Sequence, residues 1–514
     1  GTSSRSGAAE GKVGLMAVVW GSIASALFAA AAGAKLLAAE VAVHFKLGQG
    51  ATGIGAASSL ALIGAGHLMG ITVGLAMLAG LVIAWGVLVP ILTSMEPASA
   101  MSAAELAGSV WSSKVRIIGA GAIGAAAIVT LAGLAKPVIG GLRSALEASR
   151  AAKVEGAVIP RSEQDLPIFI VGLVTLIMMV PAGWLLATFL QDGVLASLAF
   201  PLVAVGVGYI LVAGIFAAAV CGYMAGLIGS SNSPVSGIAI LTILGASLSV
   251  GMVGKQIMGP EVAHALVAFA LFVTTVVLAV AVIGNDNLQD LKTGQLVGAT
   301  PWKQQVALLI GVGAGSAVVP PVLELLNRAN GFAGAPNLQA ISDNPLAAPQ
   351  ATLISTLAKG VIGNDLPWDL VMYGALLGLG LVIVNFIIKA ASKNRYSLPP
   401  LGVGLAIYLP SAVTAPVVVG AVAGWLFERA VRSATWGEAA KRLAVLVMSG
   451  FIVGESLFNV ALAGLIVASG VGEPLAIATG MSESVQMLIA LFVGGAIVSS
   501  LYRWAAKSAR RIEA

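Results

Sequence analysis

The chain alternates between long apolar runs and short polar connections. Each run is about as long as, or longer than, the roughly 20 residues that a helix needs to cross a bilayer. The expected spans are 12–33, 58–94, 114–135, 167–188, 195–228, 234–253, 263–284, 302–325, 370–391, 399–428, 440–470 and 481–503. The pattern predicts an all-α, polytopic integral membrane protein with about twelve membrane segments. The segment 36–45 is too short to span, and we expect it to lie at the interface.

Composition supports this class of protein. Hydrophobic residues make up 58% of the 514 positions and charged residues only 10%, whereas soluble proteins have about 25% charged residues. The 64 glycines suit helices that pack closely in lipid. The net charge of +5 is concentrated in a few short loops, which indicates topology and not nucleic-acid binding. Cys221 is the single cysteine, so an internal disulfide is excluded and a thiolate metal cluster is not expected.

Basic residues predict which loops face the cytoplasm. They are concentrated in 136–166, in 389–395 and in the C-terminal tail 503–511. If successive membrane crossings are counted from the cytoplasmic stretch 136–166, the connection 285–301 also lies in the cytoplasm. The long connection 326–368 has few basic residues and many Asn and Pro residues. We expect it outside the cytoplasm, with irregular structure.

The segment 399–428 is expected to be broken. The loops 393–395 and 429–442 both look cytoplasmic, yet only about 33 residues separate them, and two full crossings need about 40. Prolines interrupt the stretch at Pro399, Pro400, Pro410 and Pro416. A broken, re-entrant hairpin is the favoured interpretation, and a single kinked helix is the alternative.

An internal repeat supports the broken interpretation. Residues 61–80 align with 405–424 without gaps, and both copies are expected to break the helix at the same internal point. Paired broken segments in two halves indicate a transport site.

The clearest break lies at 219–236, inside an apolar run. Five small or polar residues precede Pro234, and they are Gly229, Ser230, Ser231, Asn232 and Ser233. Unsatisfied backbone groups there would cost several kcal/mol in lipid. Together with Tyr223, these residues predict a substrate-binding site. The alternative is a helix kink whose polar groups satisfy each other.

Four stretches resemble the oligopeptide transporter family, in its prokaryotic branch, which is related to the yellow-stripe-like metal–chelate transporters. They are CGYMAGLIGSSNSPVSG at 221–237, NDNLQDLKTGQLVGATPWKQQ at 285–305, SLALIGAGHLMGITVGLAMLAG at 59–80 and GESLFNVALAGL at 454–465. The resemblance implies a secondary importer of small peptides or metal–chelate complexes in the cytoplasmic membrane. It further implies proton coupling, alternating access and a two-fold fold of about sixteen helices.

With about twelve segments, the chain is expected to lack the N-terminal helices of that fold. Residues 1–150 would be the remainder of the first repeat, 151–166 a cytoplasmic linker and 167–514 the second repeat. The missing part would hold the first-half partner of the 219–236 break. The sequence begins with Gly1 and not with an initiator Met, and no signal peptide is expected. A fragment of this kind is not expected to transport by itself.

Two ionisable residues are candidates for proton coupling. Glu455 stands about 13 residues beyond Arg442, roughly 20 Å into a helix. An acid near the bilayer midplane is costly and is usually functional, although a structural hydrogen bond to a neighbour would also explain it. His67 lies in the first broken segment and titrates in the physiological range. Tyr408 and Ser411, at the second broken segment, are expected to line the same cavity and to bind substrate.

The remaining candidates are weaker. Asn285, Asp286, Asp290 and Lys292 are assigned to a cytoplasmic gating loop. Asn285 and Asp290 would cap helices or act in gating, and a solvated structural loop is the favoured interpretation. Glu40 and His44 stand four apart and would share one face of a helix, which is a weak metal signal. No metal site and no cofactor is predicted. Glu324 is expected at the interface.

The favoured function is import of small oligopeptides, and import of metal–chelate complexes is the alternative. An intramembrane enzyme is not supported, because the chain has three histidines and lacks His-Glu-x-x-His and Gly-x-Gly-Asp runs. A channel is disfavoured, because no ring-like selectivity filter is apparent. The lipid bilayer and the substrate are the expected partners, nucleic acid is not, and assembly with further copies is left open.

Overall fold

A computed structural model describes residues 2–96, 101–130, 132–133, 160–229, 233, 235–254, 259–332, 335, 340–346, 348–363, 367–478 and 480–513. Within these residues, 12 helices are long and apolar enough to cross a membrane, and each matches one predicted run. They are Gly11–Gly33, Leu60–Ser94, Ala103–Thr130, Arg161–Leu190, Ala196–Gly226, Val235–Gly254, Glu261–Val297, Pro301–Ala329, Trp368–Ala391, Ser411–Val431, Gly437–Ser469 and Glu483–Ile512. The prediction of a polytopic, helical membrane protein is confirmed.

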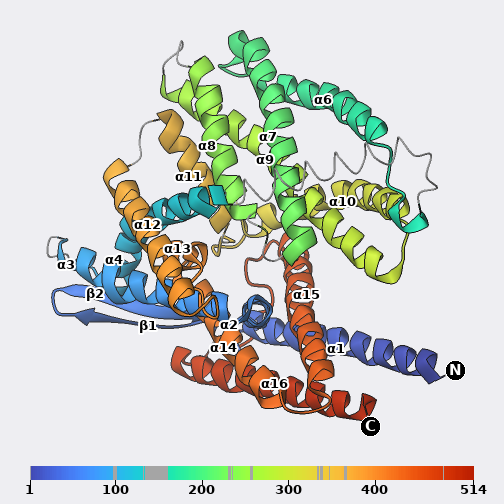
Figure 1. Ribbon diagram of the computed structural model, residues 1–514. Coiled ribbons are helices and arrows are strands. Elements are labelled where there is room, and N and C mark those ends of the chain that lie inside the picture. The colour runs from blue at the N-terminus through green and yellow to red at the C-terminus, as the bar shows by residue number, and fades with distance from the viewer. Residues whose placement is uncertain are drawn as a thin grey trace. The chain divides into compact units, whose positions relative to one another are not determined.

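The elements follow one another along the chain as labelled in Figure 1. The N-terminal part contains α1 (Thr2–Gly33), β1 (Glu40–Leu47), β2 (Gly50–Ala57), α2 (Leu60–Leu81), α3 (Val89–Ser94) and α4 (Ala103–Val110). The middle contains α6 (Ile168–Leu190), α7 (Ala199–Ile228), α8 (Val235–Gly254), α9 (Pro260–Val297), α10 (Pro301–Ala329) and α11 (Pro349–Gly363). The C-terminal part contains α12 (Trp368–Ala391), α13 (Pro400–Tyr408), α14 (Ser411–Val431), α15 (Gly437–Ser469) and α16 (Glu483–Ile512).

The chain forms two compact units. The first unit comprises Gly1–Ile123, Pro321–Ala347 and Met372–Ala514, and the second comprises Gly124–Pro320 and Ala348–Val371. The two ends of the chain therefore fold together. The predicted division into repeats at 151–166 stays a prediction, and residues 151–159 lie outside the described residues.

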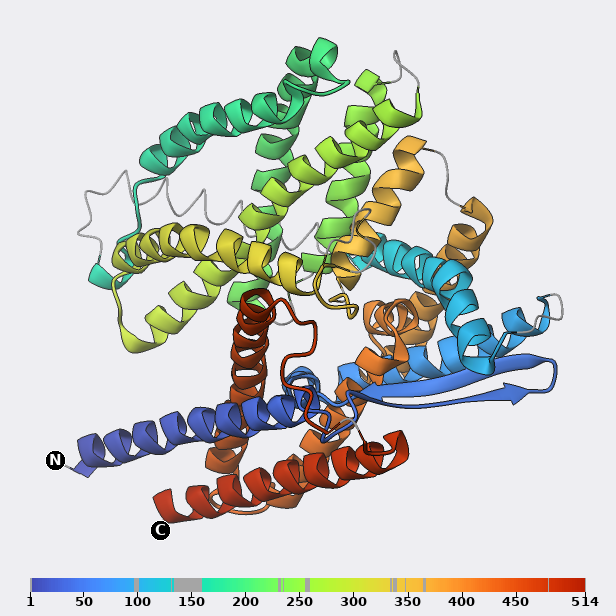
Figure 2. The ribbon, with the colours of Figure 1, turned by 180° about the vertical axis from the view of Figure 1, so that it is seen from behind.

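In the first unit, α1 and α16 both pack against α15 (Figures 1 and 2). Small residues allow the α1–α15 contact, since Gly450 and Gly454 lie against the backbone of α1 at Val18 and Ser22. Close approach through small residues is the usual way in which helices associate without a hydrophobic driving force.

The two segments aligned as a repeat pack against each other. A Cβ atom on Gly66 would overlap the carbonyl oxygen of Val417, and one on Gly420 would overlap that of Ile63. The helices α2 and α14 thus cross in backbone contact. This contact is the physical basis of the glycine-rich pattern in both copies.

Both copies are interrupted, as predicted, but the expectation that they break at the same internal point is wrong. In α2 the backbone leaves the helical region at Gly70 (φ 78°, ψ 171°). In the second copy, Leu409 is extended (φ −76°, ψ 147°) and separates α13, of 9 residues, from α14, of 21 residues. Pro410 explains this, because it lacks an N–H and disfavours a helical conformation before it. Gly70 aligns with Thr414, so the two interruptions occupy different positions of the alignment.

The segment 36–45 is not an interfacial helix. Residues 40–57 form an antiparallel hairpin, with Leu47 opposite Gly50 across a two-residue turn that begins at Gly48 (φ 62°). The hairpin extends beside α3 and α4 (Figure 2). Alternation of apolar and polar residues from Val43 to Lys46 is the period of a strand.

Two connections are more regular than predicted. The helix α9 runs for 38 residues to Val297 and ends at Gly298 (φ 69°), so most of 285–301 is helical. Within 326–368, α11 forms a helix of 15 residues that packs on α8 and α9 in the second unit. In both cases helix-forming residues such as Leu, Gln and Lys continue the pattern beyond the apolar run.

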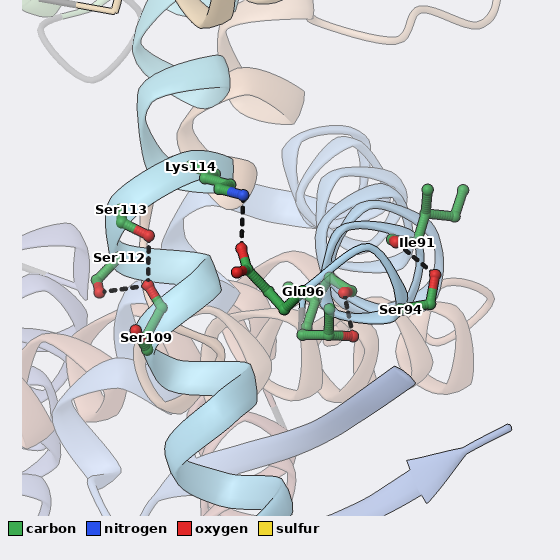
Figure 3. Close-up of polar contacts among 9 residues, drawn as sticks. Ile91, Ser94, Glu96, Ser109, Ser112, Ser113 and Lys114 are labelled. Atoms are coloured by element: carbon green, nitrogen blue, oxygen red, sulfur yellow. Dashed lines mark hydrogen bonds and ion pairs between the residues drawn. The ribbon is translucent and has the colours of Figure 1, made fainter. Parts of the chain in front are cut away.

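Hydroxyl groups near the ends of α3 and α4 are satisfied locally (Figure 3). Ser112 and Ser113 both donate to the carbonyl oxygen of Ser109, at 2.9 and 2.7 Å. Lys114 pairs with Glu96, with Nζ 2.6 Å from Oε1. Such local pairing removes the cost of placing polar groups in or near lipid.

The α2–α14 contact predicts a strong effect of added volume. We expect Gly420→Val to lower the free energy of unfolding by at least about 1–3 kcal/mol, because a side chain at this position must push two helix backbones apart. The melting temperature of the detergent-purified protein measures this. Gly464→Val is the matched control, since a Cβ atom at Gly464 meets open space inside α15. Equal melting temperatures for the two variants would contradict the backbone contact.

Candidate functional site

The side chain of Glu455, on helix α15, lies against the N-terminus of helix α2. Its Oε1 accepts a hydrogen bond from the Ser59 hydroxyl at 2.6 Å, and its Oε2 accepts one from the Ala61 N–H at 3.0 Å. The Ser59 oxygen in turn accepts a hydrogen bond from the Leu62 N–H at 3.1 Å. A carboxylate at this position satisfies N–H groups that have no partner inside the helix and is favoured by the helix dipole. Glu455 therefore joins α15 to the N-terminus of α2.

The same residue lines a polar cavity of about 420 Å³ in the first unit. The other polar side chains lining it are Lys35, Ser58, Asn330, Ser342, Asn344, Asn459 and Glu473. The cavity thus contains two carboxylates, an ammonium group and several amides. Groups of this kind can bind a small zwitterionic molecule.

Lys35 and Glu473 form an ion pair at this cavity, with Nζ 2.7 Å from Oε1. Lys35 follows the end of α1 and has a left-handed backbone conformation (φ 61°), which is uncommon for a residue with a side chain. Its carbonyl oxygen accepts a hydrogen bond from the Gln486 side chain at 2.8 Å. The backbone of Lys35 is therefore fixed, and its ammonium group is half-exposed. A ligand carboxylate could replace Glu473 as its partner.

An apolar cavity of about 340 Å³ lies beside the polar one and shares Ser58 with it. Its apolar lining includes Phe28, Ile63, Pro416 and Leu491. The pair Ser59–Glu455 stands between the two cavities, because Ser59 lines the apolar cavity and Glu455 the polar one. The two cavities together offer polar and apolar surface side by side.

His67 is buried and lines neither of these two cavities. Its Nδ1 is 2.9 Å from the Tyr502 hydroxyl, and the Tyr502 ring stacks on Phe427 with centroids 4.5 Å apart. Gly424 makes room for the imidazole, since a Cβ atom there would overlap it. This arrangement gives His67 a defined structural partner, and its role in coupling stays a prediction.

Tyr408 and Ser411 have structural partners as well. The Arg116 Nη2 donates to the Tyr408 hydroxyl at 2.9 Å, and its guanidinium lies over the Tyr408 ring at 4.7 Å. The Ser411 oxygen accepts a hydrogen bond from the Gly55 N–H at 3.1 Å. Sequence reasoning missed Arg116, although an arginine inside an apolar run is a signal in its own right.

The break at 219–236 is partly described. The helix α7 ends at Ile228, and Gly229 takes a positive φ of 88° that only glycine adopts readily. The Ser233 hydroxyl donates to the Cys221 carbonyl oxygen at 3.2 Å, and Tyr223 packs against the core of the second unit. The helix end is confirmed at this point. Ser230, Ser231 and Asn232 lie outside the described residues.

The predicted loop residues are on a helix. Asn285, Asp286, Asp290 and Lys292 all belong to α9, so the loop assignment and the predicted capping are wrong. Asn285 is buried. The loop assignment is wrong because the spanning helix continues through these polar residues, beyond the end of the apolar run. A gating role for them stays a prediction.

Glu40 and His44 lie on strand β1, not on a helix. Alternation along a strand still places both on one face, opposite Ala57 and Gly53. Among the described residues, no group of three or more His, Cys, Asp or Glu side chains could hold a metal ion. Glu324 is exposed and pairs with Arg328, with Oε1 2.7 Å from Nε.

The structure thus separates the predicted residues. Tyr223, Gly229 and Ser233 belong to the second unit. Glu455, His67, Tyr408 and Ser411 belong to the first unit, where their hydrogen-bond partners are all different. Of these four, Glu455 lines the polar cavity, which makes it the centre of the candidate site.

The hydrogen bonds of Glu455 predict a graded effect on stability. We expect Glu455→Ala to lower the free energy of unfolding by about 1–3 kcal/mol, because the Ala61 N–H and the Ser59 hydroxyl lose their acceptor. Glu455→Gln should lose less, since its amide oxygen still accepts one bond. Thermal unfolding in detergent measures both. Glu438→Ala, at an exposed acid of the same helix, is the control and should leave stability nearly unchanged. An equal loss in all three variants would contradict the role of Glu455 as hydrogen-bond acceptor.

Comparison with known proteins identifies relatives along most of the chain. Residues 6–466 match the family model described as OPT oligopeptide transporter protein. A Haemophilus influenzae protein named "Putative oligopeptide transporter" is 38% identical over 488 residues, which cover 93% of this chain and 75% of that protein. A rice protein named as a probable metal-nicotianamine transporter is 26% identical over 200 residues, covering 38% of this chain and 26% of that protein. The chain belongs to the OPT oligopeptide transporter family.

Proposed function

We propose that this protein is a proton-coupled secondary active importer of small oligopeptides, which works by alternating access in the cytoplasmic membrane. Family membership supports transport. The observation that carries the proposal is the carboxylate of Glu455, which faces a polar cavity in a helical membrane unit. An ionisable residue at such a place in a membrane protein is a functional candidate by default.

The chemistry of the two cavities supports a peptide as the substrate. A peptide has an ammonium group, a carboxylate and amides, and the polar cavity offers Glu455 and Glu473 for the first, Lys35 for the second and asparagines for the third. The adjoining apolar cavity has room for an apolar side chain. Small-molecule sites combine a few placed polar groups with apolar surface in this way.

The hydrogen bonds of Glu455 suggest how a proton could be coupled to movement. The ionised carboxylate accepts from both Ser59 and Ala61. A protonated carboxyl has one acceptor oxygen fewer and no charge for the helix dipole to stabilise. Protonation would therefore loosen the attachment of α15 to α2.

Import of metal–chelate complexes is the second candidate. The name of the rice relative favours it, and a metal–chelate complex is, like a peptide, a small polar molecule that carries carboxylate groups. Competition between short peptides and iron–chelate complexes for binding to the purified protein separates the two candidates.

Uptake by the full-length protein in liposomes tests the proposal. With an inward proton gradient, we expect accumulation of a labelled di- or tripeptide, and we expect Glu455→Gln to reduce the gradient-driven part at least tenfold. Glu438→Gln, which removes an exposed acid from the same helix, should leave uptake unchanged.

Two outcomes would contradict the coupling role. One is undiminished gradient-driven uptake by Glu455→Gln. The other is an equal loss of uptake with and without the gradient, which would point to folding or binding and not to coupling.

A further inference from the structure

A third cavity, of about 380 Å³, lies where α14 ends and α15 begins. Its lining contains three basic side chains and one acidic one, and the residues are Trp425, Glu428, Arg429, Arg432 and Lys441. It shares no lining residue with the polar or apolar cavity of the candidate transport site. A separate ligand is therefore implied by its chemistry.

The arginines of this cavity are available to an anion. Among the described residues, neither Arg429 nor Arg432 pairs with a carboxylate, and Lys441 pairs with the exposed Glu438 at 2.7 Å. The Arg429 guanidinium lies over the Trp425 ring, 5.2 Å from its centroid. That contact orients the guanidinium and leaves its N–H groups free to donate, and a planar guanidinium can hold two phosphate oxygens at once.

The backbone around the cavity is fixed. The connection between the helices is a tight turn in which the Ala434 N–H donates to the Val431 oxygen at 3.1 Å and the Gly437 N–H donates to the Ala434 oxygen at 2.9 Å. A Cβ atom at Gly437 would overlap the Val431 carbonyl oxygen. The basic groups are thus presented from rigid elements and need little ordering when a ligand binds.

More positive charge surrounds this end of the first unit. The C-terminal turns of α16 belong to the same hydrophobic cluster as the start of α15, through Ala509 and Ile512 on one side and Ala439 and Ala440 on the other. The last turn of α16 carries Arg510 and Arg511. The same bias of basic residues predicts that this end faces the cytoplasm, where the membrane surface is anionic.

We propose that this cavity binds the phosphate of an anionic lipid headgroup, held by Arg429, Arg432 and Lys441. Trp425 supports a lipid over a soluble phosphate, because it is exposed and tryptophan is favoured where acyl chains meet headgroups. Basic cavities between membrane helices at the cytoplasmic side are suited to such headgroups. The site would anchor the α14–α15 corner, and with it the broken segment that begins at α13, to the inner leaflet.

Lipid binding to the purified full-length chain tests this. Native mass spectrometry and thermal shifts are recorded with phosphatidylglycerol, with phosphatidylcholine and with inorganic phosphate alone. We expect saturable binding of phosphatidylglycerol that the double variant Arg429→Gln/Arg432→Gln weakens at least tenfold. Phosphatidylcholine should bind weakly to both proteins.

Two further variants make the result specific. Arg395→Gln is the matched control, because Arg395 also lies over an aromatic ring, that of Tyr396 at 5.6 Å, but lines none of the three cavities. It should leave binding unchanged. The variant Arg429→Lys/Arg432→Lys keeps the charge but loses the planar guanidinium, so it should bind more phosphatidylglycerol than the double Gln variant and less than the unchanged protein.

Three results would overturn the proposal. They are unchanged phosphatidylglycerol binding in the double Gln variant, an equal loss in Arg395→Gln, and saturable binding of inorganic phosphate in the absence of any lipid effect. The last would assign the cavity to a soluble phosphate. Uptake of peptide is not part of the readout, so this outcome is independent of the proposed transport function.

Discussion

The structure depends on how helix ends are satisfied in a medium without water. Each interrupted helix exposes N–H groups at its start and carbonyl groups at its end, and lipid offers no partner for either. At the start of α2 the partner is the Glu455 carboxylate of α15, which accepts hydrogen bonds from the Ser59 hydroxyl and the Ala61 N–H. The first unit therefore uses one charged side chain to place the broken segment, and the polar cavity forms around that same side chain.

Close contact between backbones is the second requirement. The crossings of α2 with α14 and of α1 with α15 are possible because glycines occupy the points where the backbones meet. These contacts leave little freedom for the helices that frame the cavities. Movement of the kind that alternating access needs would therefore involve the interruptions at Gly70 and at Leu409–Pro410, where no continuous helix has to bend.

Several polar groups within the apolar runs have a partner that explains their presence. His67 contacts Tyr502, Tyr408 accepts a hydrogen bond from Arg116, and Ser411 accepts one from the backbone of β2. Glu455 differs because it has structural partners and also lines a cavity that contains other charged groups. The proposed mechanism rests on Glu455 because it has both properties.

The sequence by itself determined the class of protein, the number and order of the spanning helices in the described part, and which segments contain an interruption. Those features follow from local properties of the chain. The length of an apolar run sets the spanning helices, and proline without an N–H or glycine without a Cβ sets where a helix can be interrupted. It did not determine the hairpin at 40–57, because its strands are short and one of them is rich in glycine. It also did not determine which polar residues meet. Glu455 and Ser59 are 396 positions apart, and whether a buried acid faces a helix end, another side chain or a cavity depends on packing that only the tertiary structure decides.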